Sequence, residues 1–242
     1  METDEENDDK DNILKGEMLG DRDIMMAQSL LKIEFPGIDG LLPPTLGPAG
    51  QFPPIRNEFV QIVNTMELHW VCLSTLGCVD PGTINYYCSG NDINLTKDTM
   101  SQIAALLHVP MSMKMIEIRV KPVHPQSGVD CGVHAIDTAY SLCQGKDPSV
   151  RKLATTEEIR RHLWSCFQNN QMTEFPHKVR PCNGNEATIW LPIFCRCRMP
   201  YFLGDEAMTP CDECGELFHA RCETIPNEVF QNKVVRWKCS KC

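Results

Sequence analysis

The sequence predicts an α+β domain followed by a small cysteine-rich module, and three observations carry this prediction. Between residues 13 and 178, segments with helical and with strand spacing of apolar residues alternate without a regular strand–helix–strand rhythm. Seven of the fourteen cysteines lie within residues 193–242. The first twelve residues carry seven acidic side chains and one lysine, as disordered tails do. We expect a disordered tail at 1–12, the domain at 13–178, a linker at 179–192 and the module at 193–242.

Turn and cap signals place the elements of the domain. Asp80-Pro81-Gly82 is a turn signal between two strand-like runs and predicts a hairpin. Thr96 is a candidate N-cap, and Thr155-x-x-Glu158 fits a capping box. A polar, proline-bounded stretch predicts the linker. The expected elements are a helix at 21–35, a strand at 59–63, a hairpin at 70–88, a helix at 96–108, a strand at 113–123, a helix from 131 to near 145, and a helix after 155.

Composition and charge limit what the chain can bind. Its 242 residues carry a net charge of −9, which argues against nucleic-acid binding through phosphate contacts. No apolar stretch is long enough for a bilayer, and the N-terminus lacks a secretory signal pattern, so we expect an intracellular protein without membrane contact. In a reducing compartment, a dense cysteine cluster indicates metal ligands rather than disulfides.

Cys131 stands where a nucleophilic cysteine would benefit, directly after a Gly-containing turn and at the start of a helical pattern. The unpaired N–H groups and the positive dipole end of a helix favour the reactive thiolate. Gln126, five residues upstream, could donate a side-chain N–H to a developing oxyanion. The alternative is that Cys131 is a small buried residue, as many intracellular cysteines are.

A nucleophilic cysteine needs a base, and His69 is the best candidate by position. It opens a strand, from which it could reach a helix N-terminus, whereas His134 follows Cys131 by three residues on one helix and should point away. The other candidates are His108 and His124. The alternative for His69, next to Trp70, is a half-buried structural pair.

The motif order resembles that of the ubiquitin-like-protein proteases, the SUMO-specific (sentrin) family related to the adenovirus protease. The matching residues are His69-Trp70, then the hairpin, then Gln126 and Asp130-Cys131-Gly132, and the resemblance spans about residues 15–170. It implies a papain-like, adenovirus-protease-like core with Cys131 as nucleophile and His69 as general base. Gln126 would form the oxyanion hole, and Trp70 would line the channel for a Gly-Gly tail. The implied reaction cleaves an amide or isopeptide bond of a ubiquitin-like protein or its conjugates.

One position departs from this family. Cys88 stands where the family has the aspartate that orients the histidine, and a thiol cannot hold an imidazolium as a carboxylate does. Asn91 or Asp92 could stand in. Two hypotheses follow: an active cysteine protease, or a degenerate protease domain that serves as a scaffold for binding.

The module contains four ligand pairs, enough for two tetrahedral zinc ions. Histidine is fifth among the eight ligands, an order that resembles a PHD finger, and Trp237 and Phe218 fit that family. The resemblance implies interleaved pairing, with one zinc on each set of four. The two sets are Cys195, Cys197, His219 and Cys222, and Cys211, Cys214, Cys239 and Cys242.

The PHD resemblance also implies a histone tail as partner, and with it a chromatin role in the nucleus. Tyr201 and Met208 lie where such fingers place the residues of an aromatic cage, although Leu217 replaces the usual tryptophan. Nearby acids could favour a less methylated lysine or an arginine; the alternative is a solvated acidic face. These acids are Asp205, Glu206, Asp212 and Glu213.

Overall fold

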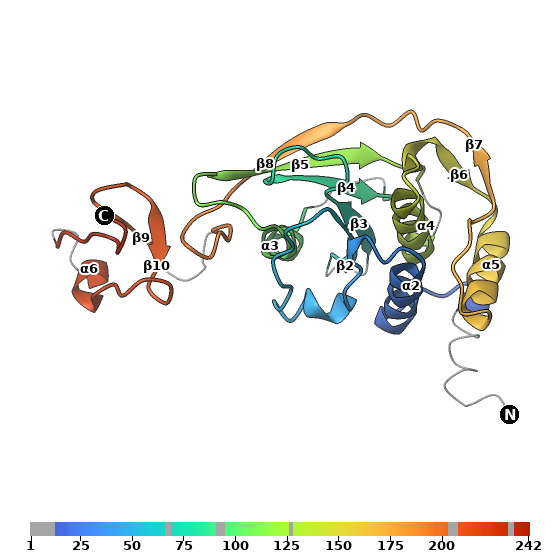
Figure 1. Ribbon diagram of the computed structural model, residues 1–242, viewed down its shortest axis with the longest axis horizontal. Coiled ribbons are helices and arrows are strands. Elements are labelled where there is room, and N and C mark those ends of the chain that lie inside the picture. The colour runs from blue at the N-terminus through green and yellow to red at the C-terminus, as the bar shows by residue number, and fades with distance from the viewer. Residues whose placement is uncertain (1–12, 66–68, 91–94, 126–127, 203–207, 232–234) are drawn as a thin grey trace, which may run out of the picture.

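The computed structural model describes residues 13–65, 69–90, 95–125, 128–202, 208–231 and 235–242. Its centre is a mixed six-stranded sheet, shown in Figure 1. In spatial order its strands are β1 (Asp39–Gly40), β2 (Phe59–Asn64), β3 (Trp70–Ser74), β4 (Thr83–Cys88), β5 (Met115–Pro122) and β8 (Ala187–Pro192). Strands β1 and β2 are parallel, as are β4 and β5, and the other neighbouring pairs are antiparallel.

Helices cover both faces of this sheet (Figure 1). The four long helices are α2 (Asp21–Glu34), α3 (Lys97–Leu106), α4 (Cys131–Cys143) and α5 (Thr156–Gln168). Helices α2, α4 and α5 share one apolar cluster, and α3 belongs to another. Helix α3 connects β4 to β5, and such a crossover is what lets two consecutive strands run parallel.

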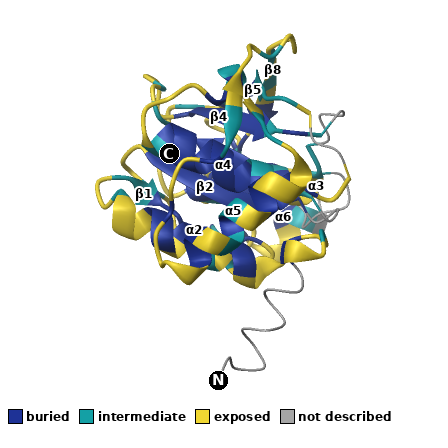
Figure 2. Cartoon of the chain, turned by 90° about the vertical axis from the view of Figure 1, so that its right-hand side faces the viewer, coloured by how far each residue is buried: buried dark blue, intermediate teal, exposed yellow. Residues whose placement is uncertain are grey.

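The sheet is buried on both sides because successive side chains point to opposite faces. On β3, Cys72 joins the cluster beneath α2 and α4, whereas Val71 and Leu73 join the cluster beneath α3. All five residues of β3 are buried, and Figure 2 shows the buried elements gathered at the centre of the chain. The central strands are therefore almost continuously apolar in sequence, which is why they were recognisable.

The predicted helices and the hairpin are confirmed. Thr96 accepts a hydrogen bond from the N–H of Thr99 at 3.2 Å, which caps α3. Thr155 and Glu158 form the expected capping box at the start of α5. In the hairpin, Cys72 lies opposite Tyr87 in an antiparallel register. Local apolar spacing and cap residues were sufficient for these elements.

The prediction of a linker over 179–192 is wrong for its second half. Residues Ala187–Pro192 form β8, which pairs with β5 along six residues and completes the sheet. Ala187, Ile189 and Leu191 point toward the apolar cluster, and Trp190 between them is 57% exposed. This period-two alternation was present in the sequence, but the flanking prolines masked it. The domain therefore extends to residue 192, and we call residues 13–192 the sheet domain.

The cysteine-rich module, residues 193–242, folds around a small cluster of its own. The rings of Phe218 and Trp237 meet edge to face, with centroids 5.6 Å apart. Its elements are β9 (Met208–Pro210), β10 (Leu217–His219), which pairs with β9, and α6 (Asn227–Gln231). The short elements of the sheet domain are η1 (Pro44–Leu46), η2 (Pro148–Val150), β6 (Arg151–Leu153) and β7 (His177–Val179). Among the residues described, no helix has the length and hydropathy needed to cross a bilayer.

Candidate active site and metal-ligand groups

Cys131 is the first residue of α4, as the sequence predicts, and it is 1% exposed. The chain enters the helix through a turn at Gly128, whose φ of +64° favours glycine. The sulfur thus lies at the positive end of a 13-residue helix, which favours a negative charge there. Position and chemistry together make Cys131 a candidate nucleophile.

A buried ion pair that the sequence analysis missed holds this helix start in place. Asp130, the residue before Cys131, accepts hydrogen bonds from Arg160 Nε and from the Thr156 hydroxyl, both at 2.7 Å. Arg160 also donates to the carbonyls of Ile13 and Val129. Both members of the ion pair are 2% exposed. Helix α5 therefore fixes the turn that presents Cys131.

His69, directly before β3, contacts Cys88 at the end of β4. Its Nε2 lies 3.1 Å from Cys88 Sγ, and burial lowers the pKa of the imidazole. Burial also raises the pKa of the Cys88 thiol, and the nearby charge of Cys131 raises it further. Hydrogen bonds from Gly90 and Tyr86 act in the opposite direction. Cys88 thus contacts His69 and is close enough to Cys131 for the charge of Cys131 to affect its pKa, whereas a catalytic pairing of His69 with Cys131 stays a prediction.

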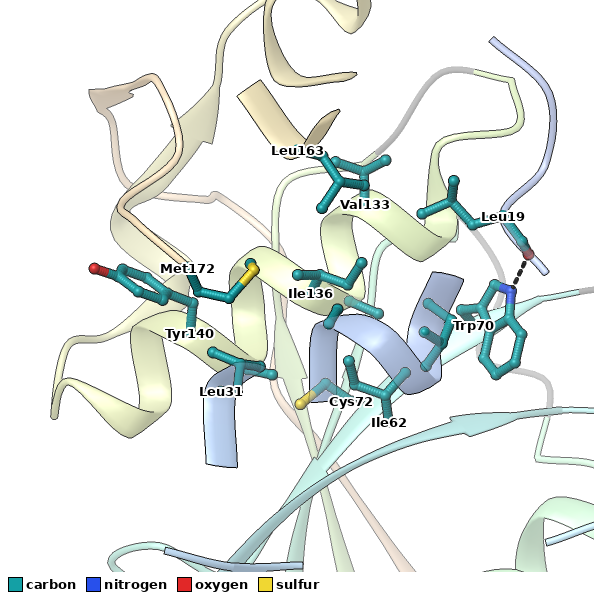
Figure 3. Packing of buried hydrophobic residues seen from close by; sticks show 14 of the residues in the cluster. Leu19, Leu31, Ile62, Trp70, Cys72, Val133, Ile136, Tyr140, Leu163 and Met172 are labelled. Carbon is teal, nitrogen blue, oxygen red and sulfur yellow. Dashed lines mark hydrogen bonds between the residues drawn. The ribbon is translucent and has the colours of Figure 1, made fainter. Parts of the chain in front are cut away.

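Trp70 lies in the core beneath α4 and is 2% exposed. Figure 3 shows its indole Nε1 donating to the backbone carbonyl of Leu19, at 2.8 Å. Leu19 also approaches Gly132 so closely that a Cβ at that position would lie 2.9 Å from the leucine Cβ. Leu19 therefore links Gly132 and Trp70, because it packs against the glycine and accepts the hydrogen bond of the indole. Contact of Trp70 with a substrate tail stays a prediction.

The other histidines contribute less to this site. Burial lowers the pKa of His134 to about 4, so it is neutral at physiological pH. The ring of His124 contacts the carbonyl of Arg180, and His108 lies on the surface near α3. Gln126, Asn91 and Asp92 lie outside the described residues, so the expected oxyanion donor and the substitutes for the missing carboxylate stay predictions.

A groove of about 550 Å³ begins beside this site. Cys88 and Gly90 line one end, and basic side chains line its course. A larger cavity, of about 780 Å³, lies between α3 and the module; His108 lies in its wall, but His69, Cys88 and Cys131 do not. The smaller groove is therefore the one that reaches the contact between His69 and Cys88.

The predicted metal ligands gather in two groups of four. In each group the ligand atoms lie within 4.8 Å of one another, and the interleaved pairing implied by the PHD resemblance is confirmed. Cys239 Sγ lies 3.6 Å from Cys242 Sγ, and Cys197 Sγ lies 3.5 Å from His219 Nδ1. The edges of a tetrahedral thiolate site are roughly 3.8 Å, given metal–sulfur bonds of about 2.3 Å. The donor set and its spacing fit a tetrahedral metal ion in each group.

The expected histone-binding residues are partly described. Tyr201 is 38% exposed, and Met208 is half-buried against the core of the module. Asp212 accepts a hydrogen bond from the backbone N–H of Trp237, and Glu213 pairs with Lys238, so both acids have partners within the module. Asp205 and Glu206 lie outside the described residues.

A polar junction connects the module to the sheet domain. Glu216 pairs with Lys114, just before β5, and with Arg198 Nη1 at 3.2 Å. Arg198 in turn donates to the carbonyl of Met113. These contacts span residues of the sheet domain and of both metal-ligand loops, so they attach the module to one end of the sheet.

Comparisons with known proteins bear on the fold. No family model and no curated protein matches this sequence. The C-terminal Ulp1 protease domain, solved in complex with Smt3, the yeast ortholog of SUMO, matches with 12% identity and a TM-score of 0.50, over 67% of this chain and 82% of that chain. A de-sumoylating protease matches with 13% identity and a TM-score of 0.46, over 68% of this chain and 85% of that chain.

The chain has an α+β fold like that of the Ulp1 protease domain. The predicted fold class is therefore confirmed. At 12% identity the likeness establishes the fold alone, and function has to be argued from the residues of the site.

Proposed function

We propose that this protein is a cysteine peptidase that cleaves an amide or isopeptide bond after the Gly-Gly tail of a ubiquitin-like protein. One observation carries the proposal: on a Ulp1-like fold, Cys131 begins a central helix, and Cys88, which contacts His69, is close enough to Cys131 for the charge of Cys131 to shift its pKa. The first matched structure is itself a complex with a SUMO ortholog, which supports a ubiquitin-like protein as partner.

In the proposed mechanism, His69 takes the proton of Cys131, and the sulfur attacks the carbonyl carbon of the terminal glycine. The N–H of Cys131 and the side chain of Gln126 stabilise the oxyanion. His69 then gives its proton to the leaving amine as a thioester forms. Water, activated by the same histidine, hydrolyses the thioester and restores the thiol.

The module has a structural and a targeting role in this proposal. Two zinc ions, one per ligand group, suit thiolate and imidazole donors in tetrahedral geometry. When bound, they supply the cross-links that a chain this short needs in order to fold. We further propose that the module is a PHD-type finger that binds a histone tail near Tyr201, Asp205 and Met208, and so directs the peptidase to chromatin in the nucleus.

The test of the peptidase is cleavage of ubiquitin-like proteins whose Gly-Gly end is joined by an amide to a fluorophore. SUMO-type and ubiquitin-type substrates are each incubated with the zinc-loaded full chain. We expect release of the fluorophore, and we expect its rate to fall by roughly a thousandfold or more in Cys131→Ala. Cys78→Ser, which changes a half-buried cysteine outside the site, is the matched control and should retain the rate.

A second candidate is favoured by Cys88, which stands where the resembled family has a carboxylate. In that case the sheet domain is a degenerate scaffold, and the protein acts only by zinc-dependent binding to a histone tail. Absence of cleavage of every substrate by folded, zinc-loaded protein, together with binding of a histone-tail peptide, would select this alternative.

A further inference from the structure

The sulfur of Cys88 lies where it can set the state of His69. Its Sγ is 3.1 Å from His69 Nε2, so Nε2 is engaged with Cys88, and Nδ1 is the ring nitrogen outside that contact. A neutral imidazole carries one proton, and its two nitrogens then have opposite roles. Whether His69 can serve as a base toward Cys131 therefore depends on which way the hydrogen bond to Cys88 runs.

The surroundings of Cys88 supply donors to its sulfur. The backbone N–H of Gly90 points to Sγ at 3.3 Å, and the hydroxyl of the buried Tyr86 also hydrogen-bonds to it. Gly90 comes so close that an added Cβ would lie 3.3 Å from the sulfur and 3.4 Å from His69 Nε2. The sulfur thus acts as a hydrogen-bond acceptor in this site, and an Nε2–H of His69 at 3.1 Å lies within reach to donate to it as well, with the thiol proton of Cys88 turned away from the ring.

We propose that Cys88 is the positioning residue of this site: its sulfur accepts the Nε2–H bond of His69 and leaves the Nδ1 lone pair free to take the proton of Cys131. This inference rests on the proposed function. The proton moves from Cys131 Sγ to Nδ1, and the resulting imidazolium keeps its Nε2–H on Cys88. No oxidant or metal is required. Cys88 thereby fills the orienting role of a carboxylate, with a weaker acceptor.

The ring of His69 gives a direct readout that does not depend on activity. In full-length protein labelled with ¹⁵N-histidine, long-range ¹H–¹⁵N spectra distinguish a protonated from an unprotonated ring nitrogen, and His69→Asn assigns the signals. We expect His69 at neutral pH to be protonated at Nε2 and unprotonated at Nδ1. Protonation at Nδ1 would overturn the proposal, because Cys88 would then be the donor and the base would be blocked.

The reactivity of Cys131 gives the second readout. Its alkylation by chloroacetamide, followed by peptide mass spectrometry, is compared among wild type, Cys88→Ala, Cys88→Asp and the control Cys78→Ser. In Cys88→Ala, loss of the orienting hydrogen bond should slow the alkylation of Cys131 roughly tenfold at pH 7. Cys88→Asp should restore or exceed the wild-type rate, and Cys78→Ser should match it.

An unchanged rate in Cys88→Ala would contradict the positioning role, even if the histidine signal were as expected. Chloroacetamide needs no ubiquitin-like partner. If the protein cleaved no ubiquitin-like substrate but showed the expected His69 signals and alkylation rates, the proposed function would be refuted. The role of Cys88 would still stand.

Discussion

At the scale of single residues, burial decides the behaviour of the histidines. His69 and His134 both have lowered pKa values because burial disfavours their charged forms. A base with a lowered pKa stays neutral, and so able to accept a proton, down to more acidic pH. The sequence indicated His69 by its place at the start of a strand and by the order of the motifs along the chain. It could not indicate the contact with Cys88, because that contact depends on how β3 and β4 pair.

The pKa of His134 predicts a loss of stability in weak acid. This histidine binds a proton below about pH 6.5 in the unfolded chain, but only below about pH 4 in the folded chain. The free energy of unfolding should therefore fall as pH drops through this window, by about 2 kcal/mol from His134 between pH 7.5 and 5. Urea unfolding at the two pH values measures it. His134→Gln should reduce the loss, whereas His108→Gln, at an exposed position, is the control; an equal loss in His134→Gln would refute the assignment.

At the scale of elements, the start of α4 depends on a partner that is distant in sequence. Arg160 looks like one polar residue of an amphipathic helix, yet its guanidinium is buried against Asp130 and the carbonyls of Ile13 and Val129. Helical spacing places Arg160, unlike the exposed Arg161, on the same face as Leu163 and Phe167, but it does not identify Asp130 as the partner. Strand β8 was missed for a related reason: its pairing with β5 is a long-range contact, and only its alternation was visible in the sequence.

Removal of Arg160 should therefore be costly. Arg160→Ala leaves the carboxylate of Asp130 buried without its cation, and such changes cost about 3–5 kcal/mol. Arg161→Ala, which removes an exposed pair with Glu157, should cost less than about 1 kcal/mol. Urea denaturation of both variants gives the comparison. If the two variants were equally stable, the ion pair would not hold the helix start as described.

At the scale of the whole molecule, two cores of different kinds are joined by the Glu216–Lys114 and Arg198–Met113 contacts and by Ile193 and Met199, which pack against the cluster beneath α3. The sheet domain buries two large apolar clusters, whereas the module has one small cluster around Phe218 and Trp237. A module with so little apolar core depends on its metal ions for folding. The ligand spacing made this module the most predictable part of the sequence, because a metal site is specified by a few residues close together in the chain.

Chelation should therefore unfold the module and spare the sheet domain. The loaded full chain should contain two metal ions, and a strong chelator should make residues 193–242 sensitive to protease while a fragment ending near residue 192 persists. Cys239→Ser should show the same sensitivity without chelator, and Cys182→Ser, outside the ligand groups, should not. Identical digestion with and without chelator would contradict a metal-dependent fold.

We propose that Cys131 is the nucleophile that attacks the tail of a ubiquitin-like protein. This proposal is tested most directly with SUMO-type and ubiquitin-type proteins whose C-terminal Gly-Gly tail ends in an electrophile. We expect a covalent adduct that peptide mass spectrometry maps to Cys131 and that is absent in Cys131→Ala and strongly slowed in His69→Ala. Folded, metal-loaded protein that forms no adduct with any of these probes, or forms one at another cysteine, would contradict it.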